Sequence, residues 1–406
     1  MRYAEVVIGG RYGDEGKGVM VDCLTSEMFD PLVVRFNGGG QAGHTVTTPK
    51  GKRHVFHHIG SGAFNLAPTW LTKEFVSNPL TFRKEFLVFP AKVFVDPFSP
   101  ITTHWDMLIN QKLEEQRAAD RHGSCGMGIR QTIERQQYND CLLHAMTLPL
   151  DMNGDVGELR SYLERMWHHY YQPRMESLLT GEFLASALER GRNKGLLESF
   201  IQAMQFFSYT TEIADSEILN GGYNIVFEGA QGLMLDMDNA ENFPHVTPSK
   251  TGLSNVLDLL RHSESQWTLN CYYMTRSYTT RHGAGPLPYE MALPDYDIKD
   301  RTNIWNEFQH QLRFAPLNLD DFNAAVEKDF SLIDDLRNVQ GRCFKVMTCY
   351  DQLPHHDDQE VLYVENGELL RVTPTAFRHK MNTVFDRVST GPTRGNMAFT
   401  HKKAMQ

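Results

Sequence analysis

The sequence is short of the features that mark secreted, membrane-spanning or disulfide-stapled chains. No stretch approaches the roughly 20 apolar residues of a transmembrane helix. The N-terminus runs directly into the strand-like segment 6–8 without an apolar signal core. The six cysteines are scattered and form no C-x-x-C pair, so we expect neither a zinc site nor a disulfide framework. These absences predict a cytoplasmic protein with free thiols.

An excess of basic charge is missing as well. The 406 residues contain 40 Lys and Arg against 50 Asp and Glu, a formal net charge of -10. Duplex-binding proteins usually present a basic field, so we expect no nucleic-acid partner. Because the overall charge repels phosphates, any nucleotide must be held by a local arrangement of amides and cations.

Short apolar runs alternate with helical patterns along the whole chain. Several runs are continuously apolar, which is typical of strands buried on both faces of a parallel sheet. The pattern predicts an α/β fold, with a mainly parallel central sheet flanked by helices in a single domain over 1–406. Residues 151–220 carry almost no strand signal and predict a helical insertion or subdomain. The expected strands are 5–8, 32–36, 87–95, 224–227, 269–274 and 344–348.

A glycine-rich loop with the sequence GGRYGDEGKG follows the first strand at 9–18, and a helix start follows the loop. This strand–loop–helix order, as in P-loop NTPases, aims backbone N–H groups at a phosphate. It is not a Walker A motif, because the first glycine and the Ser or Thr after the lysine are absent. A carboxylate in such a loop suits a Mg²⁺ ligand or a base; the competing interpretation is an acidic surface turn. The phosphate-loop candidates are Gly13, Asp14, Glu15, Gly16, Lys17 and Gly18.

Further motifs lie downstream in a fixed order. GDEGKG at 13–18, QAGHT at 41–45, FEGAQG at 227–232 and PHVT at 244–247 resemble signatures of the adenylosuccinate synthetase family. The resemblance implies that Asp14 is a catalytic base and Mg²⁺ ligand, with the Gly43 carbonyl as a second ligand. It implies that Lys17 and His44 contact the transferred phosphoryl group. It also assigns acceptor-nucleotide contacts to Gln41, Gln231 and Thr247.

Three later segments continue the resemblance. YTTRHGAGP at 278–286 is similar to the family's Ser-Thr-Arg-Val-Gly-Ala-Gly-Pro, and TCYD at 348–351 to its Thr-Lys-Leu-Asp. STGP at 389–392 matches directly, so the implied donor-base site is Asp351, Ser389 and Gly391. A carboxylate suits guanine, whose N1–H and 2-amino groups are donors, and this favours GTP. Cys349 stands where the family has lysine, so ATP stays open.

The sequence departs from the family where acceptor and aspartate should bind. GSCGMG at 123–128 replaces the 5′-phosphate loop Gly-Thr-Thr-Gly-Arg-Gly, leaving Ser124 and Cys125 as candidate contacts. Arginine binds a carboxylate bidentately, as an L-aspartate site requires. Arg313 is our first choice and Arg301 our second, with Thr302 and Asn303 as partners.

The resemblance implies a C–N-forming ligase of purine nucleotide biosynthesis. It would join L-aspartate to IMP, hydrolyse GTP through a 6-phosphoryl intermediate, use Mg²⁺ and act as a homodimer. A phage branch of the family instead converts dGMP, with ATP or GTP, and also departs at the phosphate and aspartate sites. A third possibility from another class is a nucleotide-binding module without ligase activity.

Overall fold

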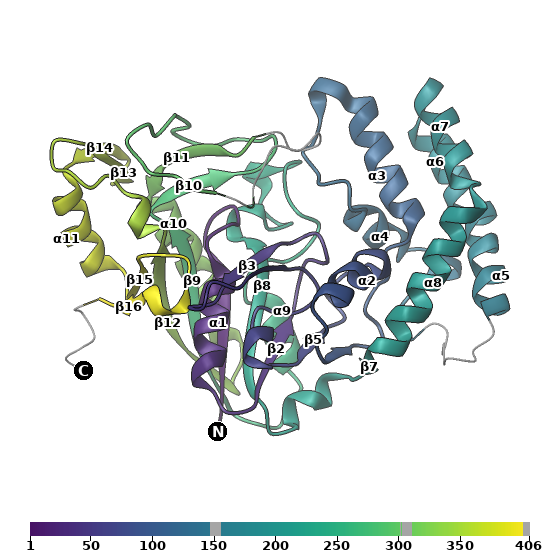
Figure 1. Ribbon diagram of the computed structural model, residues 1–406, viewed down its shortest axis with the longest axis horizontal. Coiled ribbons are helices and arrows are strands. Elements are labelled where there is room, and N and C mark those ends of the chain that lie inside the picture. Colours follow the sequence, from purple (N-terminus) through teal and green to yellow (C-terminus); the bar gives the residue numbers. More distant parts are fainter. Residues whose placement is uncertain (147–155, 301, 303–310, 401–406) are drawn as a thin grey trace.

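The computed structural model describes residues 1–146, 156–300, 302 and 311–400. Within them, ten strands form one central sheet in the order β16-β15-β12-β9-β1-β8-β2-β5-β6-β7 (Figure 1). Neighbouring strands are parallel except β15 and β16. The mainly parallel α/β sheet predicted from the sequence is therefore confirmed. The bounds are β1 Arg2–Gly9, β2 Pro31–Arg35, β5 Thr69–Leu71, β6 Val93–Val95, β7 Glu212–Ile213, β8 Asn224–Gly232, β9 Trp267–Arg276, β12 Val339–Thr348, β15 Arg387–Ser389 and β16 Met397–Phe399.

Helices bury both faces of this sheet, which explains why its central strands are apolar throughout. Val7 of β1 packs with Met20 of α1 (Lys17–Glu27) on one face. The neighbouring Val6 packs on the other face in a core that includes Leu257 of α9 (Ser254–Leu260) and Phe322 of α10 (Leu319–Phe330). Successive side chains of a strand point to opposite faces, so a strand covered on both sides needs no polar alternation.

A helical layer lies at one end of the sheet, on the right of Figure 1. Its core joins Trp105 of α3 to Trp167 and to Phe200 of α8. Of the predicted helical region 151–220, residues 156–220 are described, and they also contain the two-residue strand β7, which pairs with β6 at the sheet edge. The helices are α2 Pro79–Val88, α3 His104–Arg117, α4 Ile129–Arg135, α5 Val156–Met166, α6 Gln172–Leu178, α7 Gly181–Gly191 and α8 Lys194–Thr210.

The strand predicted over 87–95 is wrong in its first half. Leu87 and Val88 end helix α2, and only Val93–Val95 forms β6. The helix starts upstream because the Asn78 side chain accepts from the amides of Leu80 and Thr81, with a proline in the first turn. An apolar run does not distinguish the exposed end of a helix from a buried strand.

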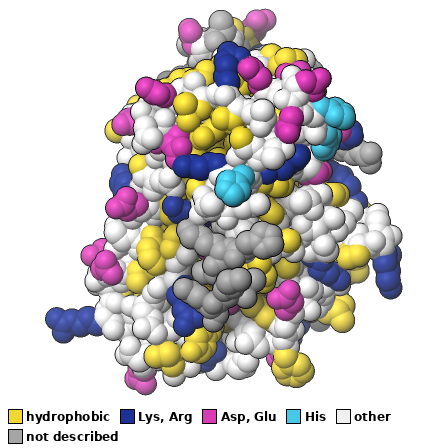
Figure 2. All heavy atoms as spheres, turned by 90° about the vertical axis from the view of Figure 1, so that its left-hand side faces the viewer, with side chains coloured by type: hydrophobic (Ala, Val, Ile, Leu, Met, Phe, Trp, Pro, Cys, Tyr) yellow, Lys and Arg dark blue, Asp and Glu magenta, His cyan; other side chains and the backbone are white. Residues whose placement is uncertain are grey.

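A second, four-stranded sheet in the order β10-β11-β13-β14 lies beside the central one, and β3 and β4 form a separate two-stranded hairpin that packs against α1. In the described part of the chain, no helix is both long and apolar enough to cross a bilayer. Figure 2 shows acidic and basic side chains interspersed over the face it presents. The remaining bounds are β3 His44–Thr47, β4 Arg53–Phe56, β10 Tyr278–Arg281, β11 Arg313–Asn318, β13 Val361–Glu365, β14 Glu368–Val372 and α11 Pro374–Val384.

Candidate active site

A cavity of about 880 Å³ opens beyond the carboxyl ends of β1, β8, β9 and β12. This is where open α/β sheets place their ligands, because the loops that leave parallel strands converge there. The segments that line it include 12–19, 41–45, 123–125, 127–131, 244–248, 348–349, 351–352 and 391–392. Motifs separated by hundreds of residues in the sequence thus face one space.

The glycine loop enters this cavity between β1 and α1. Gly16 has φ 79° and directly precedes Lys17, the first helical residue. The carboxylate of Glu15 turns back under the loop: Oε1 accepts from the amides of Arg11 (3.0 Å) and Gly13 (2.8 Å), and Oε2 accepts from Lys17 Nζ (3.0 Å). Both members of this ion pair are buried. Part of the phosphate-binding capacity is therefore occupied internally in the free chain.

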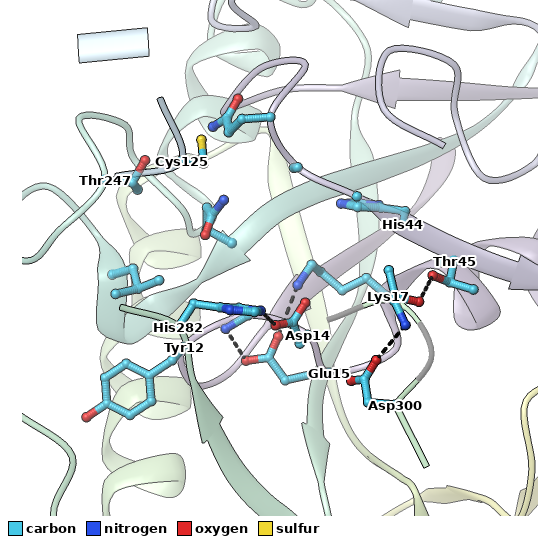
Figure 3. Close-up of a pocket in the computed structure, with 18 of the residues that line it drawn as sticks. Tyr12, Asp14, Glu15, Lys17, His44, Thr45, Cys125, Thr247, His282 and Asp300 are labelled. Carbon is cyan, nitrogen blue, oxygen red and sulfur yellow. Dashed lines mark hydrogen bonds and ion pairs between the residues drawn. The ribbon is translucent and has the colours of Figure 1, made fainter. Parts of the chain in front are cut away.

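Asp14 lies at the tip of the loop with left-handed backbone, φ 61°. Its Oδ2 is 2.8 Å from His282 Nε2, and Arg276 donates to its backbone carbonyl (Figure 3). Burial acts to raise the pKa of Asp14, but the hydrogen bond and charge of His282 outweigh it. Together with Arg276 and Lys17, they lower the pKa to about 2. The carboxyl is consequently ionised at neutral pH, as a base or a metal ligand must be.

His44, at the start of β3, is oriented by a buried carboxylate. Its Nδ1 lies 2.5 Å from Glu228 Oε1, and Glu228 also accepts from the hydroxyl and the amide of Ser61. Burial lowers the pKa of His44 to about 4. The neighbouring His44 and Arg35 hold the pKa of Glu228 down to about 2, against its burial. The imidazole is thus neutral, with its proton on Nδ1, because an ionised carboxylate only accepts.

The acceptor side combines the 123–128 loop with Gln41, Gln231 and Thr247, which all line the cavity. Ser124 is tied by Asn110, whose Nδ2 donates to Ser124 Oγ (2.7 Å) and whose Oδ1 accepts from the Gly128 amide (3.0 Å). Cys125 lines the same wall.

An arginine absent from the loop reappears one helical turn further on. The family's arginine position is Met127 here, whereas Arg130, in the first turn of α4, lines the cavity and donates to the Val246 carbonyl (3.4 Å). Arg130 therefore stands beside Thr247, a predicted acceptor contact.

The predicted aspartate residues separate in the structure. Thr302 lines the cavity, where its Oγ1 lies 3.0 Å from Thr45 Oγ1 and accepts from Arg53. Arg313 lies in β11 instead, bound to Glu290 and donating to the carbonyls of Gly283 (3.0 Å) and Gly285 (2.8 Å). Its guanidinium holds a turn together rather than lining the described cavity wall. The other two candidates, Arg301 and Asn303, lie outside the described residues.

The donor-base candidates Asp351, Ser389 and Gly391 all line the cavity. Cys349 has left-handed backbone, φ 57°, at the end of β12. Thr348 ties this segment to the phosphate loop, because its Oγ1 donates to the Glu15 carbonyl (3.1 Å). The donor-base segment and the phosphate loop are thereby held in fixed relation.

A divalent cation has suitable oxygen donors here. Asp14 supplies a carboxylate, and Gly43 lines the same cavity with its backbone. Among the described residues, no group of three or more His, Cys, Asp and Glu side chains could enclose a metal on its own. A small set of oxygen donors fits Mg²⁺, which is usually bound by one or two carboxylates together with waters and substrate phosphates.

Sequence reasoning missed four residues of the site. Glu228 belongs to the FEGAQG motif, but its contact with His44 joins residues far apart in the sequence and could not be recognised without the structure. Arg276 precedes a quoted motif and binds Asp300 (3.0 Å) beside Asp14. His282 and Arg130 were visible only as departures from the family pattern. Those departures were the signal that could have found them.

Comparison with known proteins gives a consistent result at the level of sequence. The model of the adenylosuccinate synthetase family matches residues 6–313. An adenylosuccinate synthetase of Picrophilus torridus is 30% identical over 380 residues, which cover 89% of this chain and 86% of the relative. The enzyme of a Psychrobacter species is 29% identical over 70% of this chain; the aligned part spans just under two thirds, 65%, of that relative.

Solved structures share the fold. The fully ligated adenylosuccinate synthetase of Plasmodium falciparum superposes with a TM-score of 0.72, covering 98% of this chain and 99% of its own at 16% identity. The succinoaminodeoxyadenylate synthetase of cyanophage S-2L, bound to dGMP and to dATP as an energy donor, gives 0.62 at 13% identity, covering 100% and 97%. At these identities, the likeness concerns the fold alone.

Proposed function

The chain belongs to the adenylosuccinate synthetase family and is a C–N-forming ligase of purine nucleotide biosynthesis, and we propose how its own residues carry out that reaction. The reaction joins the amino group of L-aspartate to the 6-position of IMP, and GTP is hydrolysed to GDP and phosphate. The observation that carries the proposal is that Asp14, Lys17, His44 and Gln231 line one cavity with the acceptor and donor-base loops. The enzyme acts in the cytoplasm as a homodimer.

Activation of the purine is the first chemical problem, because a 6-oxo group leaves poorly. Asp14 takes the proton from N1, and Gln231 holds the base in register. The negative charge that develops on O6 makes it the nucleophile toward the γ-phosphate. Asp14 is suited to this role because it is ionised and faces the cavity.

Lys17 and His44 stabilise the charge on the transferred phosphoryl group. Lys17 must leave Glu15 to do so. His44 is neutral in the free chain, so it takes a proton from solvent onto Nε2 when the polyanionic donor binds, and Glu228 across the ring stabilises the imidazolium that results. A Mg²⁺ ion held by Asp14 and the Gly43 carbonyl would neutralise charge on the donor phosphates. The amine of aspartate then displaces the 6-phosphoryl group, giving phosphate as product.

The substrates are assigned to separate walls of the cavity. The 5′-phosphate of the acceptor binds at Ser124 and Thr247, with Arg130 in place of the missing loop arginine. L-Aspartate binds around Thr302, beside Arg53. The guanine of GTP binds Asp351, whose carboxylate accepts from N1–H and the 2-amino group.

One substrate panel tests the proposal. IMP, GMP, dGMP and AMP are each offered with GTP or ATP, with and without aspartate, and released phosphate is measured. We expect release only when aspartate is present, and fastest with IMP and GTP. If dGMP is turned over faster than IMP, the acceptor is dGMP and not IMP. A chain that never releases phosphate under any combination would reject the ligase assignment.

A further inference from the structure

His282 meets the base of the reaction directly. Its Nε2 lies 2.8 Å from Asp14 Oδ2, and both side chains keep about a quarter of their surface exposed, 24% and 23%. Both line the cavity, and Figure 3 shows the imidazole reaching the carboxylate from a different segment of the chain. The family pattern has valine at this position, and a valine side chain cannot donate such a hydrogen bond.

The turn that carries His282 is held firmly. It follows β10, and Arg281 of that strand is buried, with Nη2 donating to the His245 carbonyl (3.0 Å). Arg313 fixes the next residue by donating to the Gly283 carbonyl (3.0 Å). Gly283 has φ 67°, and a Cβ there would come 3.0 Å from the Gly123 carbonyl oxygen. The imidazole is therefore presented from a rigid support that also touches the acceptor loop.

The carboxylate of Asp14 is less constrained than its backbone. Asp14 belongs to a loop of glycines, and Arg276 fixes its backbone carbonyl rather than its carboxylate. A carboxylate has two oxygens, and a donor on one of them fixes the plane and direction of the other. His282 donates to one lone pair of Oδ2, which leaves Oδ1 for the purine and a second lone pair of Oδ2 that could bind a cation.

We propose that His282 is a positioning residue for Asp14, which holds the carboxylate so that its second oxygen meets N1–H of the acceptor purine. This inference rests on the proposed function and assigns a role that the valine of the family pattern does not supply. Displacement of a catalytic group by about 1 Å can cost about 100-fold in rate, so a single well-directed hydrogen bond matters here.

Three variants separate positioning from substrate contact. His282→Val restores the family's residue, His282→Gln keeps a side-chain N–H that can reach Asp14, and His168→Gln changes an exposed histidine outside the site as the control. We expect His282→Val to lower kcat about 30-fold with KM for IMP changed less than about twofold. His282→Gln should recover most of the loss, and His168→Gln should match the parent. A raised KM at unchanged kcat, or a Gln variant no better than Val, would overturn the proposal.

A second measurement needs no turnover. The thione and thiolate forms of 6-thio-IMP absorb at different wavelengths, so its ultraviolet spectrum reports removal of the N1 proton in the bound state. We expect the parent to shift the spectrum toward the thiolate, Asp14→Asn to abolish the shift, and His282→Val to reduce it while 6-thio-IMP still binds. Because loss of the imidazole also removes a contact that lowers the pKa of Asp14, a reduced shift reports misdirection of the carboxylate and not weaker basicity. An identical shift in His282→Val and parent would refute positioning. A parent that shifts the spectrum but releases no phosphate would refute the ligase assignment alone.

Discussion

At the scale of single residues, three of the eight described non-glycine residues with positive φ line the cavity. Asp14 and Gln231 both have left-handed backbone, φ 61° and 63°, although neither is glycine, and both line the cavity. Such conformations cost about 1–3 kcal/mol and persist only where the surroundings enforce them. The strain turns a carboxylate and an amide toward the same space, which a relaxed loop would not do.

Replacing Asp14 tests the base directly. Asp14→Ala should lower kcat by about 100- to 10,000-fold, the usual range for loss of a general base. Asp14→Asn should be similarly inactive yet still bind IMP, because the amide preserves shape and hydrogen bonding. Phosphate release measures the first effect and titration calorimetry the second. A near-normal rate in Asp14→Ala would remove this residue from the mechanism.

Glu228 can be tested through the negative charge it places beside His44. In Glu228→Gln the side chain keeps its shape and a hydrogen bond to Nδ1, but it can no longer stabilise the imidazolium that donates to the phosphoryl group. We expect kcat to fall at least about 100-fold with KM for GTP little changed. Glu217→Gln, an exposed substitution outside the site, is the matched control. A fall in kcat accompanied by a clear fall in melting temperature would instead indicate general damage to the fold.

At the scale of elements, the sequence predicted the long central strands and missed the short ones. Strands β1, β2, β8, β9 and β12 are apolar because helices cover both faces, and that burial is legible in composition. β5, β7 and β15 have two or three residues, so no periodic signal marks them. The apolar run at 87–88 shows the same limit, because the cap at Asn78 starts a helix that extends through these residues.

The cap of α2 carries a stability prediction. Asn78 is buried, and its Oδ1 accepts from the amides of Leu80 (3.1 Å) and Thr81 (3.3 Å). Asn78→Ala leaves both amides without that partner and should destabilise the chain by about 1 kcal/mol, whereas Asn78→Ser should cost less. The measurement is the melting temperature of the three proteins. Equal losses for Ala and Ser would show that the cap is not the source.

At the scale of the whole molecule, the sequence predicted which motifs act together but not how every side chain is directed. The family resemblance grouped Lys17, His44 and Asp351 from the sequence, and the convergence of loops that leave parallel strands explains why they line one cavity. The position of Arg313 outside the cavity lining follows from the antiparallel pairing of β11 with β10, which places Arg313 opposite Arg281. No local pattern encodes that register.

Asp329 links distant parts of the fold and gives stability a dependence on pH. At the end of α10, it accepts from the Leu253 amide (2.9 Å) and from Tyr273 Oη (2.8 Å) of β9. Burial raises the pKa of Asp329 to about 6 from 3.8. The folded state therefore binds this proton more tightly than the unfolded state. Its contribution to stability falls as pH rises from about 4 to about 6, by roughly 3 kcal/mol in all.

Asp329→Asn removes that dependence. The melting temperature of the variant minus that of the parent should increase as pH rises from 4.5 to 7, because only the parent must ionise a buried carboxyl. Thermal melts at four pH values measure the difference. A difference that stays constant with pH would mean that Asp329 is not protonated in the folded protein below pH 6.

The Glu15 carboxylate inside the glycine loop has a consequence for work at the bench. Two loop amides already donate to it and the charge of Lys17 is already paired with it before any nucleotide arrives. Sulfate or inorganic phosphate from a buffer would have to displace the Glu15 carboxylate from these donors, and such a small ion makes few other contacts. The triphosphate of GTP can displace it because the guanine of the same molecule binds at Asp351. Common buffer salts should therefore compete weakly with GTP, beyond ordinary screening of charge.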